Sequence, residues 1–144
     1  MARKVKRKER EHFKDYVREV ARYLWLGSWQ VNVELEHMCD DPDGTVAGES
    51  VVTAQYKEVT ITFDPDLLGA HPSTVREVVT HELMHCHYGE LQHVTDAAIS
   101  KLGDEARVIA QNVATREMER FIVTVSRLVD QTMPKYVPYA KAKS

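Results

Sequence analysis

The stretch 78-VVTHELMH-85 contains the pattern H-E-x-x-H within a segment of regularly spaced apolar residues. On an α-helix, residues four apart lie on one face, so His81 and His85 can present two imidazoles to one metal ion. Glu82 lies about 100° round the helix axis from His81, where its carboxylate can reach a water molecule beside that metal. Zn²⁺ suits imidazole ligands and an open coordination position. This stretch therefore predicts a zinc-binding helix around which the rest of the chain folds.

The residues before this pattern predict where the helix begins. A Pro-Ser-Thr sequence occupies 72–74, and Thr74 with Glu77 has the form of a capping box. An apolar stripe follows, so the metal-binding pattern falls in the second and third turns of a buried helix. Ionisable groups on such a helix cost free energy unless a metal or a partner satisfies them. The alternative is a polar helix face whose histidines bind nothing.

Length and composition predict one globular domain with a cytoplasmic location. The chain has 144 residues, of which 43% are hydrophobic and 28% charged, and its net charge of −3 is unlike that of a general polyanion-binding protein. No apolar run approaches the roughly 18 residues of a membrane span, and no apolar leader segment is present. Cys39 and Cys86 are too few for a disulfide framework, so both are expected to be reduced thiols.

Charge is unevenly distributed along the chain. Residues 1–22 carry nine Lys or Arg against four Asp or Glu. Residues 1–8 are expected to form a basic, flexible arm that can bind nucleic acid or an acidic partner. A solvated helix start is the more ordinary interpretation of such a segment.

Periodicity predicts an α+β fold: an N-terminal helix, a small three-stranded and largely antiparallel sheet, the metal-binding helix and C-terminal helices. The first helix is expected from Glu9 to about Leu26, with Gly27 as its stop. Strict alternation predicts a strand over 29–36, and two further β-rich runs cover 49–55 and 58–63.

The second half of the chain is predicted to be helical. Gly89 is expected to end the metal-binding helix, and a helical pattern then runs over 95–131 with a break at Gly103. We expect a single domain over 9–133 and a tail over 134–144. Between the first two strands, Asp40–Gly44 has the composition of a solvated turn, and a calcium site is the less favoured alternative.

A catalytic zinc usually has three protein ligands, so one more must come from elsewhere in the chain. His93 could ligate by looping back. Glu105 lies twenty residues after His85, at a predicted helix start, whereas Glu117 and Glu119 lie in the middle of the last helix. Glu119 is one turn from Ile122, which turns it toward the core, where a carboxylate needs a partner. Pairing of these glutamates with nearby arginines is the alternative.

Taken together, the layout resembles the minimal gluzincin-like zinc metallopeptidases that phages often encode. The resemblance covers roughly residues 10–130 and rests on the segment 26-LGSW-29, the pattern 81-HELMH-85 and the segment 119-ERFI-122. It implies that His81, His85 and Glu119 bind Zn²⁺ and that Glu82 is the general base of peptide hydrolysis. For a phage-encoded chain, the location would be the host cytoplasm.

The resulting hypothesis is a zinc metallopeptidase acting on a protein or peptide substrate. The substrate is expected to lie extended along the strand at 58–63, and Tyr88, His93 or Tyr136 could stabilise the oxyanion. One alternative is a zinc-binding protein without catalytic activity. The other is an adaptor that uses the basic arm, with nucleic acid as a less favoured partner. We expect no membrane partner, and the oligomeric state stays open.

Overall fold

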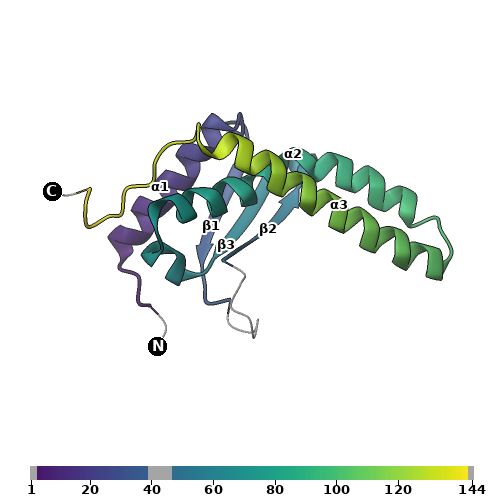
Figure 1. Cartoon of the computed structure of the whole chain (residues 1–144), viewed down its shortest axis with the longest axis horizontal. Helices are drawn as coiled ribbons and strands as arrows, with labels where there is room; N and C mark the ends of the chain where they lie inside the picture. The colour runs from purple at the N-terminus through teal and green to yellow at the C-terminus, as the bar shows by residue number, and fades with distance from the viewer. Residues whose placement is uncertain (1–2, 39–46, 143–144) are drawn as a thin grey trace.

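The computed structural model describes residues 3–38 and 47–142 (Figure 1). Its α+β class and its three-stranded sheet confirm the predicted fold. Cys39 and the Asp40–Gly44 segment lie outside the described residues. None of the described helices is long and apolar enough to cross a membrane. The elements, in order, are α1 (Arg7–Tyr23), β1 (Gln30–Leu35), β2 (Gly48–Thr53), a 3₁₀ turn (Ala54–Tyr56), β3 (Glu58–Phe63), a second 3₁₀ turn (Pro65–Gly69), α2 (Pro72–Ile99) and α3 (Asp104–Asp130).

The sheet has the strand order β1-β3-β2 and is mixed. A short connection joins β2 to β3, and its last residue, Lys57, has a left-handed φ of 51°, so these two strands pair antiparallel. In contrast, β1 pairs parallel to β3, with Val33 opposite Ile61. One of the two strand pairings is thus parallel, where a largely antiparallel sheet was expected. Alternation within β1 identifies the strand but carries no information about the direction of its neighbour.

One face of the sheet forms the core beneath the helices (Figure 1). Alternate residues of β3 point to this face, and Val59, Ile61 and Phe63 are completely buried. The Phe13 ring of α1 meets Phe63 edge-on, with 5.2 Å between the ring centroids. Because Phe13 recurs with other buried residues at helical spacing, α1 buries one stripe and leaves its charged residues in solvent.

The helix that carries the H-E-x-x-H pattern is longer than expected, and Gly89 does not end it. Instead, α2 runs through Gly89 to Ile99. A Cβ atom at Gly89 would lie 2.8 Å from Cγ1 of Val52 and 3.0 Å from Cβ of Ala54. Glycine at position 89 therefore allows α2 to approach β2 closely. In the sequence alone, a glycine with this role looks the same as a glycine that ends a helix.

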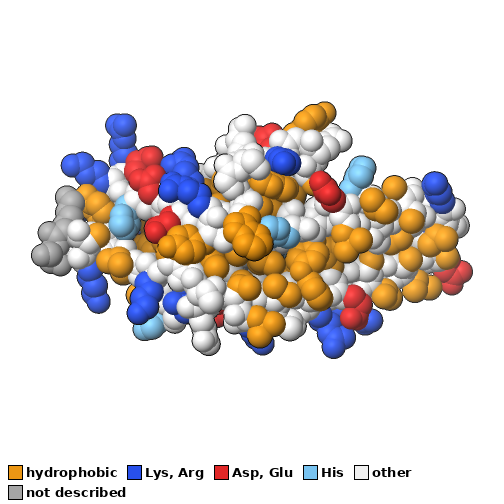
Figure 2. All heavy atoms as spheres, turned by 90° about the horizontal axis from the view of Figure 1, so that it is seen from above, with side chains coloured by type: hydrophobic (Ala, Val, Ile, Leu, Met, Phe, Trp, Pro, Cys, Tyr) orange, Lys and Arg blue, Asp and Glu red, His pale blue; other side chains and the backbone are white. Residues whose placement is uncertain are grey.

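Beyond Gly89, α2 and α3 form an antiparallel pair that extends past the sheet (Figure 1). The turn between them lies at 100–103, in agreement with the break predicted at Gly103. Hydrophobic side chains are exposed along this pair, as Figure 2 shows in its right half. Exposed members in the part beyond Gly89 include Leu91, Val94, Val108 and Ile109.

Both chain ends pack against α1. The Tyr16 hydroxyl donates a hydrogen bond of 3.0 Å to the Pro134 carbonyl, and Tyr136 is only 3% exposed. At the other end, Arg3 forms an ion pair with Glu9. The predicted tail therefore packs against the first helix at Pro134 and Tyr136.

Candidate metal centre

Three of the predicted site residues converge on one point between α2 and α3. Nε2 of His85 lies 3.4 Å from Oε1 of Glu119, and Nε2 of His81 lies 3.6 Å from Oε2 of the same carboxylate. The three ligand atoms all lie within 4.8 Å of one another. Two ligands about 2.1 Å from a zinc ion, at a tetrahedral angle, lie about 3.4 Å apart. The spacing of these side chains would therefore allow them to hold one metal ion of this size.

The convergence follows from the register of two antiparallel helices. His81 and His85 lie one turn apart on the face of α2 that is turned away from the core residues Val79 and Leu83. Glu119 lies midway along α3, where the two helices run side by side. An edge-on contact between the two imidazole rings, with centroids 5.2 Å apart, keeps them on the same side of α2.

The other candidates for the third ligand lie elsewhere. Glu117 interacts with Arg116 and Arg120 at 3.3–3.4 Å and lines a separate hollow together with Met118. Glu105 is exposed in the first turn of α3, about 21 Å along the helix from Glu119. His93 lines a neighbouring hollow, together with His85 and Asp96. In the part of the chain that the structure describes, none of these three belongs to the group around His81.

Glu82 is buried beside the three candidate ligands, against β2. Its side chain contacts Gly48, where an added Cβ would come within 3.0 Å of Glu82 Cγ. Burial raises the pKa of Glu82 to about 7, although a hydrogen bond with the Ser50 side chain lowers it, and the Glu119 and Glu49 charges raise it further. A carboxyl group in this environment can exchange a proton near neutral pH.

Strand β2 contributes a wall of the site that sequence reasoning missed. Gly48, Glu49 and Ser50 line a cleft of about 260 Å³ with Glu82 and the three candidate ligands. Gly48 and Ser50 occupy inward-facing positions, where an ordinary strand of this sheet carries an apolar residue. That departure from alternation is the signal that could have indicated a functional strand.

The sheet topology corrects the prediction of which strand receives a substrate. Strand β3, over 58–63, lies in the middle of the sheet and pairs with a strand on each side, so it offers no free edge. Strand β2 is an edge strand and also lines the cleft. The sequence suggested β3 because β3 is the last strand before α2. The order of strands in the sheet, however, differs from their order along the chain.

The proposed oxyanion residues are also separated by the fold. Tyr136 packs against Phe13 and Tyr16 in the core beside α1. Tyr88 contacts Phe121 and lines the hollow that contains Glu117. His93 alone of these three shares a hollow with a candidate metal ligand.

Burial favours the neutral form of the His85 imidazole. Burial lowers the pKa of His85, the Glu119 carboxylate raises it and His81 lowers it. Neutral imidazole is the form that binds metal ions. The adjacent Cys86 is buried in the core, and burial raises the pKa of its thiol to about 12, so it is an inert packing residue.

Comparisons of the chain with protein-family models, with curated proteins and with solved structures found no match. The class of the protein is therefore defined by its own fold and side chains. It is a small α+β chain with a mixed sheet and a two-histidine, one-carboxylate group beside a buried glutamate.

Proposed function

We propose that this chain is a zinc-dependent hydrolase of peptide bonds, in which His81, His85 and Glu119 hold the metal ion. The observation that supports the proposal most directly is that a carboxylate 34 residues after His85 lies 3.4 Å from its Nε2 atom. The side chains carry the donor set of a catalytic zinc site, two imidazoles and one carboxylate. When bound, Zn²⁺ supplies a Lewis acid that activates water and polarises a carbonyl group.

Glu82 is the general base in this proposal. It directly follows the ligand His81 on α2, and its carboxylate lines the same cleft as the three ligands. It takes a proton from the attacking water and passes it to the amine that leaves when the peptide bond breaks. Ser50 lines the same cleft beside Glu82 and lowers the pKa of its carboxyl group, which favours the ionised form that acts as a base.

The edge of β2 gives the proposed substrate a place to bind. An edge strand has backbone N–H and C=O groups without a partner strand, and an extended peptide can pair with them. The small residues Gly48 and Ser50 keep this side of the cleft open toward Glu82. The supported substrate class is therefore an extended peptide segment.

The first experiment measures metal content by mass spectrometry after zinc reconstitution. We expect about one zinc per chain in the wild type, and strongly reduced zinc in His81→Ala and Glu119→Ala. Glu117→Ala is the matched control, because Glu117 lies on the same helix and pairs with arginines outside the cleft. A wild type without zinc, or equal zinc loss in Glu117→Ala and Glu119→Ala, would contradict the proposed centre.

The second experiment separates a hydrolase from a zinc-binding protein without catalytic activity. Glu82→Gln keeps the size of the side chain and removes the base, so zinc should stay bound while cleavage of a fluorogenic peptide library falls at least a hundredfold. Cleavage that persists in Glu82→Gln would exclude Glu82 as the base. If the wild type binds zinc but cleaves no peptide, the chain is a zinc-binding protein without catalytic activity, and the zinc stabilises the contact between α2 and α3.

A further inference from the structure

A second charged surface lies on α1, away from the metal centre. Five cationic residues recur at spacings of three and four and so share one face of the helix. In the described part of the chain, Arg18 alone among them has a carboxylate within ion-pair distance, the exposed Asp15 at 3.1 Å. We call these residues the basic stripe: Arg7, Arg10, Lys14, Arg18 and Arg22.

The basic stripe carries more positive than negative charge. Like charges at i,i+3 and i,i+4 repel each other, and three carboxylates, Glu11, Asp15 and Glu19, lie at such spacings from members of the stripe and offset part of this repulsion. The neighbouring face of α1 carries the buried residues Phe13 and Val17, which pack into the core. Because four of the five cations have no ion-pair partner among the described residues, an anionic partner is the natural source of compensating interactions.

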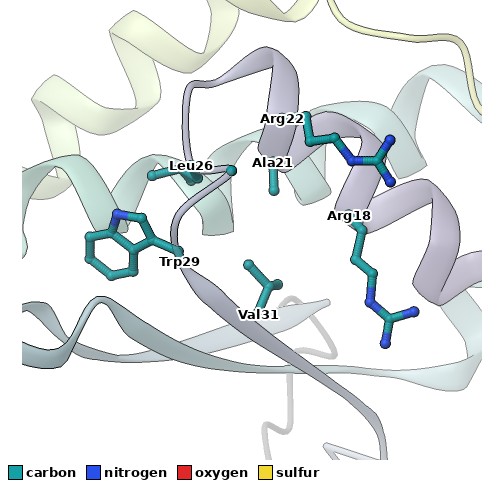
Figure 3. A pocket seen from close by; sticks show the side chains of 7 residues that line it. Arg18, Ala21, Arg22, Leu26, Trp29 and Val31 are labelled. Atoms are coloured by element: carbon teal, nitrogen blue, oxygen red, sulfur yellow. The ribbon is translucent and has the colours of Figure 1, made fainter.

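At its C-terminal end the basic stripe borders a hollow of about 200 Å³ (Figure 3). Arg18 and Arg22 extend from α1 on one side of this hollow, and the indole of Trp29 lies on the other. Ala21 and Val31 line the space between them. Guanidinium groups and an aromatic ring thus border one shallow site.

Trp25 adds a second aromatic side chain with no structural role. It is 90% exposed, and its φ of 59° is left-handed, a conformation that favours glycine at the end of a helix. Its backbone N–H donates to the Arg22 carbonyl, which glycine would do equally well. Both tryptophans of the chain therefore lie in the short connection between α1 and β1.

We propose that the basic stripe, Trp25 and Trp29 form a binding site for single-stranded nucleic acid. The cations contact successive phosphates along about 22 Å of helix, and the indoles provide faces on which bases stack. An acidic peptide would use the cations and leave the exposed indole without a stacking partner. A membrane surface would need the apolar face of α1, which Phe13 and Val17 bury in the core.

The test titrates the full chain against a fluorescein-labelled oligothymidylate of about twenty nucleotides, followed by anisotropy. With five phosphate contacts, affinity should fall about a hundredfold between about 50 and about 200 mM salt. Because both tryptophans lie in the proposed site, binding should also quench intrinsic fluorescence. Trp25→Gly preserves the left-handed backbone and should weaken binding about tenfold.

Two double variants test the charges at equal net charge. Arg18→Gln/Arg22→Gln should lower the slope of log affinity against log salt by about 1.4, whereas Lys101→Gln/Arg107→Gln, at the far turn, should leave it unchanged. Absence of binding at low salt, or equal loss in both double variants, would overturn the proposal. Tighter binding to a duplex of the same length would also overturn it. So would equal affinities for heparin and for the oligonucleotide that stay equal in Trp25→Gly, because stacking on Trp25 would then contribute nothing to binding.

Discussion

The α2–α3 pair contains two regions that share the same helices and differ in what surrounds them. The first, here called the root, comprises residues 72–89 and 118–130, and the second, the tip, comprises residues 90–117. In the root, Val79, Leu83 and Ile122 are completely buried, whereas in the tip Val94 and Ile109 are 64% and 59% exposed. All three candidate metal ligands lie in the root, where packing against the sheet determines the position of each backbone.

The root and the tip differ in what stabilises their helices. Short isolated helices are marginal in water, so helices in proteins depend mostly on tertiary packing. The root has that packing, which holds Glu119 at a defined distance from His81 and His85. The tip has mainly the mutual contact of two helices, so we expect its backbone to open more readily than that of the root.

The largest expected effect compares two leucines on α2. Leu83→Ala removes a completely buried side chain from the root and should lower the free energy of unfolding by about 2–5 kcal/mol. Leu91→Ala makes the same chemical change in the tip, where the side chain is 59% exposed, and should cost under about 0.5 kcal/mol. Urea denaturation of both variants measures the contrast, and similar losses would mean that the tip is packed against something in solution.

A second, smaller contrast compares two ion pairs that involve α3. In the root, Arg76 forms two hydrogen bonds with Asp130, at 2.9 and 3.0 Å, between side chains that are 16% and 14% exposed. In the tip, Arg107 contacts Asp104 at 2.8 Å, but Asp104 is 93% exposed.

Replacing the carboxylate should therefore have unequal effects. Asp130→Asn leaves the partly buried Arg76 guanidinium without its charged partner and should cost about 1.5–3 kcal/mol. Asp104→Asn should cost under about 0.5 kcal/mol, because solvent screens an exposed pair. The salt dependence of urea unfolding is the matching check, and a loss in Asp104→Asn as large as that in Asp130→Asn would remove the distinction between the two regions.

Local patterns predicted the fold class, the three strands and the helix that carries 81-HELMH-85. Alternating apolar residues predicted the strands at 29–36 and 58–63, and β-rich composition predicted the run at 49–55. The helix was predictable because its apolar residues recur every three or four positions. The direction in which β1 pairs with β3 could not be predicted, because β1 alternates in the same way beside a parallel or an antiparallel neighbour. At the site, 81-HELMH-85 identified three side chains on one helix, but the third ligand depended on the rotation of α3.

Glu117 and Glu119 illustrate that limit. They flank Met118, a partly buried residue, and lie about 200° apart round the helix axis. In the sequence, two features distinguished them: the spacing of Glu119 from Ile122, and the resemblance of 119-ERFI-122 to the gluzincin-like pattern. Packing of α3 on α2 places Glu119 beside the histidines and turns Glu117 toward Arg120. The local pattern thus ranked the two carboxylates, and tertiary packing determined which of them faces the cleft.

Gly89 lies at the boundary between root and tip, and its role provides the smallest test of the comparison. An alanine there gains about 1 kcal/mol of helix propensity, but its Cβ would lie 2.8 Å from Val52 Cγ1 and 3.0 Å from Ala54 Cβ. Such overpacking costs about 1–3 kcal/mol. Gly89→Ala should therefore have a net cost of about 1 kcal/mol in urea unfolding, although it improves the helix.

Gly27→Ala is the control for this substitution, because a Cβ at Gly27 would have no atom within 4 Å. It should change stability by under about 0.5 kcal/mol. If Gly89→Ala were stabilising, α2 would not depend on its close approach to β2, and the root would end before Gly89. A cost at Gly89 alone would mean that contact with the sheet extends to this residue, and that the cleft wall at Ser50 depends on the same approach.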